Sequence, residues 1–437
     1  MQQNDSFSTR CLQLALDDPA RALVVLWRHL RDHTKLQAGF DRWRCVNQRT
    51  RALKALQNSE VLKAVHPLAA LGAVDELLAT ATDFGLDRRS RVIELSEPWG
   101  SGRYYLVPRR EGWTSTLAQS QPRQREFWLR RHQIFPDQHR TISVDLCRLP
   151  ERLYRYFGES SLSIQASAFE DGILVNWQET SPYRFPSLQD PPGRQASVEA
   201  ILHEADEAGV RILVLPELTI DPAARQAIHR WLRRRRGRTS LALVVAGSFH
   251  ENDLHRSDVQ RNVAYVYDRF GDELTRHLKI QPMAITSEAG VDFDEGIEGG
   301  SRARLFQAPF GLVGLGICLD FCEMGDLPVT DLWKVVGPAL MLVPSMGGRS
   351  TLHAHQAKSK QLALQHGTVA VVAQQEPKTG QGLGMVCYSN GSVTGSQEVG
   401  QGQTNAKLKP DEMPSAHRML QESPTCRISI RWTLTER

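Results

Sequence analysis

Hydrophobic and polar positions follow two different periods along this chain, and the change between them separates strands from helices. Short apolar runs that are typical of buried strands recur through the second part of the sequence. We expect such strands at 161–168, 172–178, 211–215, 241–247, 262–267, 276–280, 309–318, 339–343, 369–373 and 384–388. Helical segments are expected between them, at about 197–208, after Asp221-Pro222 and at about 353–366. Strands that alternate with helices predict an α/β domain.

The first 155 residues show a different pattern. Leucines at 23, 26 and 30 recur at helical spacing after Asp18-Pro19, and further helical stretches are expected at 47–57, 59–64 and 67–83. Two strands, at 91–95 and 104–107, are expected to pair through a turn rich in Gly and Ser. We therefore predict a mainly helical (α+β) N-terminal module at 1–155 and a second domain at 156–437. The residues beyond about 400 are polar and are expected to form a tail that packs on a partner or is partly disordered.

Charge supports this division. Residues 1–150 carry 23 Lys and Arg against 16 Asp and Glu, a net charge of +7, whereas the rest of the chain carries −3. Several arginines surround Trp128 at positions 123, 125, 130 and 131. Arginine beside tryptophan is one way to bind a polyanion, and a solvated helix face whose tryptophan covers the core is the alternative. The N-terminal module is thus a candidate binding unit for a nucleic acid or a protein.

Composition excludes several classes of protein. The 437 residues contain no apolar run near the roughly 20 that a membrane helix needs, and the N-terminus lacks the pattern of a signal peptide. Seven scattered cysteines form neither a disulfide framework nor a CxxC pair that would indicate zinc. These features favour a cytoplasmic protein without a metal.

One apolar strand ends abruptly on Cys318. Glycines at 311, 314 and 316 allow neighbouring backbone to approach this strand closely. A residue at the end of a strand lies where the sheet gives way to a loop, which is a common place for chemistry. Burial in the core is the alternative, because free cysteine is among the most buried residue types.

Two further chemically active residues follow apolar runs in the same way, Glu217 and Lys279. A carboxylate, an amine and a thiol at one edge of a sheet are what a cysteine hydrolase needs. The carboxylate would take the proton of the thiol, and the protonated amine would stabilise the negative charge that develops on the substrate. Taken singly, Glu217 could pair locally near a strand end, and Lys279 could be a solvated amine.

The segments around these residues resemble the nitrilase, or carbon–nitrogen hydrolase, superfamily over roughly residues 160–400. Residues 213–218 resemble the family's base segment, Leu278-Lys279 with Pro282 resembles its lysine segment, and residues 314–320 resemble its nucleophile segment. The flanking segments that agree are 262–264, 343–345 and 362–373. The resemblance implies a four-layer αββα sandwich, hydrolysis of a non-peptide C–N bond through a cysteine thioester, homo-oligomers and no cofactor.

The resemblance also implies residue roles. Glu217 would be the base, Cys318 the nucleophile, and Lys279 together with the backbone N–H of Leu319 the oxyanion donors. A second glutamate would orient the lysine. We assign it to Glu288, with Glu295 and Glu298 as alternatives.

The chain departs from the family pattern at two places. Asp320-Phe321-Cys322-Glu323 lacks the aromatic-proline step that usually follows the cysteine, and Gln365-His366 replaces a Glu-Asn pair. These departures lie near the expected substrate region, so the sequence does not name the substrate. Cys322 is a candidate to resolve an oxidised Cys318, and packing is the alternative.

We therefore predict an amidase-type hydrolase of a small-molecule amide. Two alternatives stay open: an N-acyltransferase that delivers the thioester to an amine, and a binding or signalling protein of this fold with little turnover.

Overall fold

The computed structural model divides the chain into two compact units, residues 1–139 with 309–311 and residues 140–308 with 312–437. The residues it describes are 13–14, 17–32, 74–75, 78, 93–96, 103–108, 132–157, 161–169, 182–183, 187–188, 190–253, 256, 258–286, 292–308, 310–322, 328–376, 382–389, 391–395 and 425–431. None of the helices within these ranges has the length and apolar character that crossing a membrane requires.

The first unit contains the predicted helix and the predicted pair of strands. Helix α2 (Pro19–Asp32) begins after Asp18, whose side chain accepts a hydrogen bond from the Arg21 N–H, and it buries Leu23 and Leu26. Strands β1 (Ile93–Ser96) and β2 (Arg103–Pro108) are antiparallel, as predicted, and β3 (His132–Pro136) adds a third strand to this sheet. The short β4 (Gln138–His139) follows. The expected helices at 47–57 and 59–64, most of 67–83, and the basic segment around Trp128 lie outside the described residues.

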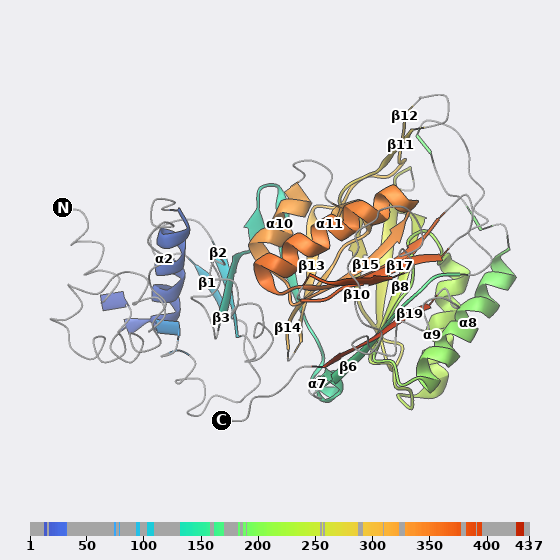
Figure 1. Cartoon of the computed structure of the whole chain (residues 1–437), viewed down its shortest axis with the longest axis horizontal. Helices are drawn as coiled ribbons and strands as arrows, with labels where there is room; N and C mark the ends of the chain where they lie inside the picture. Colours follow the sequence, from blue (N-terminus) through green and yellow to red (C-terminus); the bar gives the residue numbers. More distant parts are fainter. Residues whose placement is uncertain are drawn as a thin grey trace, which may run out of the picture. The chain divides into compact units, whose positions relative to one another are not determined.

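The second unit is built on two sheets (Figure 1). One has the strand order β10 (Glu273–Leu278), β9 (Gln260–Asp268), β8 (Leu243–Asn252), β7 (Ile212–Val214), β6 (Ser161–Ser167) and β19 (Thr425–Arg431). In the other, the strands of this unit have the order β18 (Val393–Gly395), β17 (Gly382–Cys387), β16 (Val369–Gln375), β15 (Leu340–Met346), β14 (Gly311–Leu315), β13 (Arg302–Ala308) and β5 (Ile142–Arg148). A small hairpin joins β11 (Ala284–Thr286) to β12 (Asp292–Asp294). The expected strand at 172–178 lies outside the described residues.

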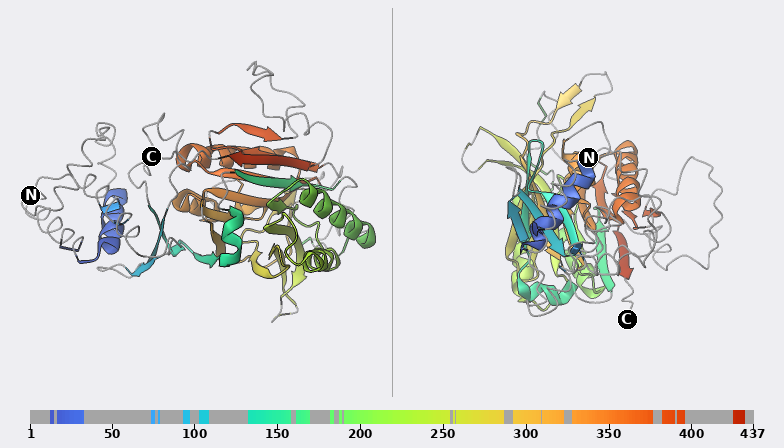
Figure 2. Two further views of the ribbon diagram at one scale, coloured as in Figure 1. Left: turned by 90° about the horizontal axis from the view of Figure 1, so that it is seen from below. Right: turned by 90° about the vertical axis from the view of Figure 1, so that its left-hand side faces the viewer.

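Helices cover the outer faces of these two sheets (Figures 1 and 2). Helices α8 (Pro191–Glu207) and α9 (Pro222–Arg235) pack together, and α9 contacts β8. The other sheet carries α11 (Arg349–His366) on β16 and β17, with α10 (Pro328–Val336) beside α11. The sheets contact each other through β15 with β8 and β16 with β6. Contacts therefore run from helix to sheet to sheet to helix, and the predicted α/β class is confirmed.

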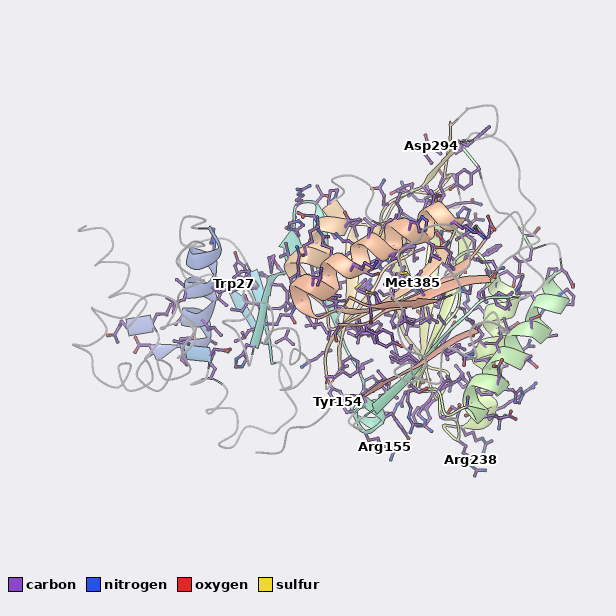
Figure 3. The ribbon with its side chains drawn as sticks, viewed as in Figure 1. Trp27, Tyr154, Arg155, Arg238, Asp294 and Met385 are labelled. Carbon is purple, nitrogen blue, oxygen red and sulfur yellow. The ribbon has the colours of Figure 1, made fainter. Side chains whose placement is uncertain are left out.

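The apolar residues between these layers form the core. Leu202 of α8, Ile228 and Leu232 of α9, and Val244 of β8 belong to one buried cluster. Burying each such side chain contributes about 1.5–3 kcal/mol. Met385 of β17 is also buried, whereas Arg238, just after α9, lies exposed (Figure 3). Asp190 and Asp221 accept hydrogen bonds from the first turns of α8 and α9, so each helix begins at an aspartate followed by proline.

Two segments lie elsewhere than the sequence predicted. Residues 140–155, which were expected in the N-terminal module, belong to the second unit, because β5 pairs in parallel with β13, about 160 positions further along the chain. The short α7 (Glu151–Phe157) follows β5. The polar C-terminal tail contains β19, which pairs antiparallel with β6 along all seven residues of each strand. The binding role of the N-terminal module stays a prediction.

Candidate active site

Glu217 lies at the end of β7, in a turn held on both sides. The Glu217 N–H donates to the Ser345 carbonyl, and the Leu218 N–H donates to the Ser248 hydroxyl. Leu218 has a φ of 56°, a conformation that few non-glycine residues adopt. Gly247 of β8 makes this approach possible, because a Cβ there would lie 2.2 Å from the Pro216 carbonyl oxygen. The turn therefore fixes a buried carboxylate that is 1% exposed.

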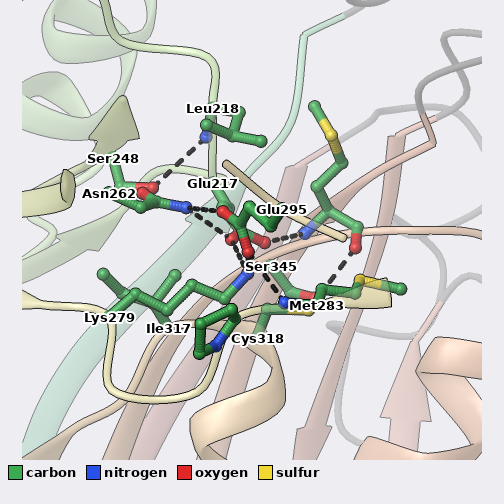
Figure 4. A network of polar contacts seen from close by, with 12 residues as sticks. Glu217, Leu218, Ser248, Asn262, Lys279, Met283, Glu295, Ile317, Cys318 and Ser345 are labelled. Atoms are coloured by element: carbon green, nitrogen blue, oxygen red, sulfur yellow. Dashed lines mark hydrogen bonds and ion pairs between the residues drawn. The ribbon is translucent and has the colours of Figure 1, made fainter. Parts of the chain in front are cut away.

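Lys279 follows β10 and is 2% exposed. Its Nζ lies 2.9 Å from Glu217 Oε1 and 2.6 Å from Glu295 Oε2 (Figure 4). Backbone bonds from Lys279 to the Asn262 carbonyl and from Gly300 to the Lys279 carbonyl fix the chain at this position. The bland reading of Lys279 as a solvated amine is therefore wrong.

Cys318 is the first residue of the short helix η4 (Cys318–Asp320), directly after β14. Its φ is 47°, so the chain turns sharply at the thiol. The Cys318 Sγ lies 3.5 Å from the Met346 carbonyl oxygen, while the Met346 N–H donates to Glu217 Oε2 at 2.9 Å. The same residue thus contacts both the thiol and the carboxylate. The predicted close approach at Gly314 is confirmed, since a Cβ there would meet the Met341 sulfur at 2.3 Å.

The glutamate that pairs with Lys279 is Glu295, at the end of β12. Glu288, our first choice for this role, lies outside the described residues. Glu298 forms ion pairs with Arg256 and Arg261 and is half exposed, so it is not at the site. Of the three candidates, Glu295 is the one that the structure brings to the amine.

Two polar residues that the sequence did not single out complete the network. Asn262 Nδ2 donates to Glu217 Oε1 at 2.9 Å and to Glu295 Oε1 at 3.0 Å. His250 Nε2 lies 2.9 Å from Glu295 Oε1, and the Met283 N–H donates to Glu295 Oε2. Asn262 belongs to a segment that already matched the family pattern. The signal for His250 would have been a histidine in the middle of an otherwise apolar strand, β8.

Electrostatics gives the two buried glutamates different states. Burial raises the pKa of Glu217, and the charge of Glu295 adds to this while Lys279 opposes it. Burial also acts to raise the pKa of Glu295, but Lys279 and the hydrogen bond from His250 outweigh it and lower that pKa to about 2. Burial alone would lower the pKa of Lys279, but attraction to Glu217 and Glu295 holds it well above its usual value. Lys279 is thus a cation, Glu295 is its counter-ion, and Glu217 is the proton acceptor.

Asp320 holds the lysine segment against the nucleophile turn. Its Oδ1 accepts from the backbone N–H groups of Ile280 and Gln281 at 3.0 and 2.8 Å. Its Oδ2 lies 3.0 Å from His277 Nε2 and accepts from the Ile317 N–H. One buried carboxylate therefore positions both Lys279 and Cys318. Leu319 comes next to Cys318 in η4, and the role of its N–H as an oxyanion donor stays a prediction.

Glu295→Gln is expected to lower turnover while leaving the chain folded, because a misplaced ammonium loses its geometry toward the substrate. The pKa of Glu295 is depressed from 4.5 to about 2, so its ion pair stabilises the fold above pH 4.5 and is lost as pH falls toward 2. Acid unfolding of the variant, followed by circular dichroism, should therefore depend less on pH between these values. Glu288→Gln is the matched control. Loss of turnover in Glu288→Gln with normal turnover in Glu295→Gln would return the role to Glu288.

No family model matches this chain. Over 169 residues the chain is 25% identical to an omega-amidase from Xenopus tropicalis, a match that covers 36% of this chain and 58% of the relative. The chain therefore spans less than two thirds of the length of this curated relative.

Solved structures give weaker likenesses. One is Nit3 of Saccharomyces cerevisiae, a member of branch 10 of the nitrilase superfamily, with 15% identity, a TM-score of 0.39, and coverage of 54% of this chain and 84% of that one. Another is an amidase from Nesterenkonia sp., with 18% identity, a TM-score of 0.38, and coverage of 53% and 84%. With the motifs around Glu217, Lys279 and Cys318, the omega-amidase match confirms the resemblance to the nitrilase superfamily over about half of the chain.

Proposed function

We propose that this chain hydrolyses the C–N bond of a small amide through a thioester on Cys318. The observation that carries the proposal is the contact of Lys279 Nζ with two buried carboxylates, one of which, Glu217, shares Met346 with the Cys318 thiol. A proton acceptor, a fixed cation and a nucleophile thus lie together at strand ends. The omega-amidase similarity supports the reaction class.

The reaction begins when Glu217 accepts the proton of the Cys318 thiol and the thiolate attacks the amide carbon. Negative charge moves to the amide oxygen, where the Lys279 ammonium and the Leu319 N–H stabilise it. The C–N bond then breaks, and the amine leaves with the proton that Glu217 held. In the second half, Glu217 deprotonates a water molecule that attacks the thioester, which releases the acid and restores the thiol. Glu295 remains ionised throughout and holds Lys279 in position.

An apolar wall stands beside these groups. Leu218 and Met346, which flank the turn of Glu217, pack with Tyr183, Leu188 and Phe249. Burial and the nearby charge of Glu295 raise the pKa of Tyr183, so its hydroxyl stays protonated, and it donates to the Met283 carbonyl. We propose that this wall contacts the acyl part of the amide.

Ammonia release from a panel of short primary amides tests the proposal. Acrylamide is a useful member, because it adds to the active-site cysteine of an amidase from Nesterenkonia sp. AN1. Mass spectrometry of the acid-quenched protein should show an acyl group on the peptide that contains Cys318. An acyl group on another residue, or hydrolysis without any acyl-enzyme in single-turnover conditions, would contradict the thioester.

Iodoacetamide near neutral pH should label Cys318 well before Cys387 or Cys147. Burial raises the pKa of Cys387 to about 12, and the Cys147 thiol lies against the Thr275 hydroxyl at 3.7 Å. Lys279→Ala should slow the labelling of Cys318, because it removes the cation that favours the thiolate. The same variant leaves two buried carboxylates uncompensated and should lose about 3–5 kcal/mol of stability. Labelling is therefore compared at a temperature where circular dichroism shows both proteins folded, and equal labelling of all seven cysteines would contradict the proposal.

A further inference from the structure

A second thiol and an imidazole lie beside Cys318, and the proposed reaction uses neither. Cys322 follows one turn after Cys318, and its N–H donates to the Cys318 carbonyl at 3.2 Å. His355 reaches the same place from α11. Its two ring nitrogens each lie 3.5 Å from Cys322 Sγ. All three side chains are fully buried, and one ligand atom from each lies within 4.8 Å of the others.

The surroundings of His355 settle which nitrogen is free. Ser345 Oγ donates to Gln374 Oε1 at 3.3 Å and lies 2.8 Å from His355 Nε2. Because the hydroxyl has given its proton to Gln374, it accepts a hydrogen bond from Nε2–H. Nδ1 then carries the lone pair on the side of Cys322. Burial lowers the pKa of His355 to about 3, so the ring is neutral near pH 7.

We propose that Cys318, Cys322 and His355 form a binding site for one thiophilic metal ion of the zinc class. Zn–S distances near 2.3 Å and Zn–N distances near 2.0–2.1 Å place the ligand atoms of a tetrahedral site about 3.5–3.8 Å apart. The separation of 3.5 Å between Cys322 Sγ and His355 Nδ1 already meets this requirement. Two sulfurs and one imidazole favour zinc, cobalt as its probe, or Cu(I) over magnesium and calcium.

The residues behind the imidazole fit the second layer of a metal site. Ligating histidines usually donate their other ring N–H to an oxygen, which fixes the tautomer and the direction of the ring. The Ser345 hydroxyl accepts that bond here, and Gln374 is in turn fixed by its donation to the Gly347 and Gly348 carbonyls. Three protein ligands leave a fourth position for water, the arrangement of an open zinc site.

Binding replaces two S–H bonds with two bonds from sulfur to the metal and releases two protons to solvent, so no oxidant is needed. Because one of the ligands is Cys318, the ion would occupy the sulfur that forms the thioester. The site would therefore act as an inhibitory one. This consequence rests on the proposed function, whereas the site itself does not.

Cobalt titration of the reduced, metal-free full chain tests the site. The wild-type protein should bind one Co²⁺ ion with intense thiolate-to-cobalt absorption in the near ultraviolet and the visible bands of a tetrahedral ion. Cys322→Ser and His355→Asn should each weaken binding by at least about 10- to 100-fold. Cys387→Ser, which changes a buried cysteine in β17, is the matched control and should bind as the wild type does. Absence of the thiolate band, or a Cys322→Ser variant that binds normally, would overturn the proposal.

Zinc K-edge absorption of the wild-type protein gives the same answer without a variant. Two sulfur ligands and at least one imidazole nitrogen are expected, and a shell of oxygen and nitrogen alone, or oxidation to a Cys318–Cys322 disulfide in place of metal uptake, would overturn the site. The two proposals fail separately. Cobalt binding without amide hydrolysis would leave the site and refute the enzyme, whereas hydrolysis that zinc does not inhibit would leave the enzyme and refute the site.

Discussion

Replacing Cys318 by alanine is expected to abolish amide hydrolysis, with a loss of turnover on the order of 10⁴- to 10⁶-fold. The thioester mechanism needs a sulfur at this position, and the other nearby thiol cannot replace it. Burial and the hydrogen bond with Cys318 hold the pKa of Cys322 far above its usual value, so Cys322 is not a nucleophile near neutral pH. The measurement is the release of ammonia under steady-state conditions, together with the search for an acyl-enzyme by mass spectrometry.

The control for this variant is Cys387→Ala, which removes an equally buried thiol far along the chain in β17. Its turnover should match that of the wild type if its fold does. Cys318→Ala should itself remain folded, because alanine leaves only a small gap where the sulfur was. Hydrolysis that persists in Cys318→Ala would leave a nitrilase-like scaffold with another function.

The main candidate residues could be predicted because each follows an apolar strand. Glu217 follows β7, Lys279 follows β10 and Cys318 follows β14, and the strand ends meet in space. The choice among the later glutamates could not be made, because the segment between Lys279 and Glu295 has no periodicity that fixes which carboxylate turns inward. That choice depends on backbone pairing, since the Glu295 N–H donates to the Met283 carbonyl.

The same limit explains the two misplaced segments of the fold. Strand β5 alternates like any half-buried strand, but its partner β13 lies on the far side of the whole first half of the domain in sequence. Strand β19 follows a long polar stretch, and its sequence Thr425–Arg431 alternates polar and apolar residues only briefly. Local pattern reports that a strand can form, whereas the identity of its partner depends on contacts between distant residues.

The paired glutamates show what sequence alone could not supply. Two carboxylates and one ammonium are buried together, and one carboxylate must stay ionised for the amine to remain a cation. His250 and Asn262 decide which, because His250 contacts Glu295 and not Glu217. Neither residue matches a chemical motif, so their role follows only from the geometry. The asymmetry leaves Glu217 as the group whose proton affinity is raised.

This asymmetry makes Glu217→Gln the sharpest test of the base. Turnover is expected to fall by about 10²- to 10⁴-fold, because an amide cannot accept the proton of the thiol or of the attacking water. Labelling of Cys318 by iodoacetamide should be retained or become faster. Removing a negative charge beside the thiol favours the thiolate, and Lys279 keeps its counter-ion Glu295. Loss of turnover with an intact, reactive nucleophile is the signature of a missing base.

The pH profile separates this role from a structural one. Burial raises the pKa of Glu217 above 4.5, so kcat/KM of the wild type should fall as pH drops through that raised value and the base becomes protonated. The variant should lack this acidic limb at every pH where circular dichroism shows it folded. Glu298→Gln, which changes a half-exposed carboxylate away from the site, is the matched control and should keep both the limb and the turnover. Glu217→Gln with normal turnover, or with turnover and Cys318 labelling lost together in a folded protein, would remove Glu217 from the role of base.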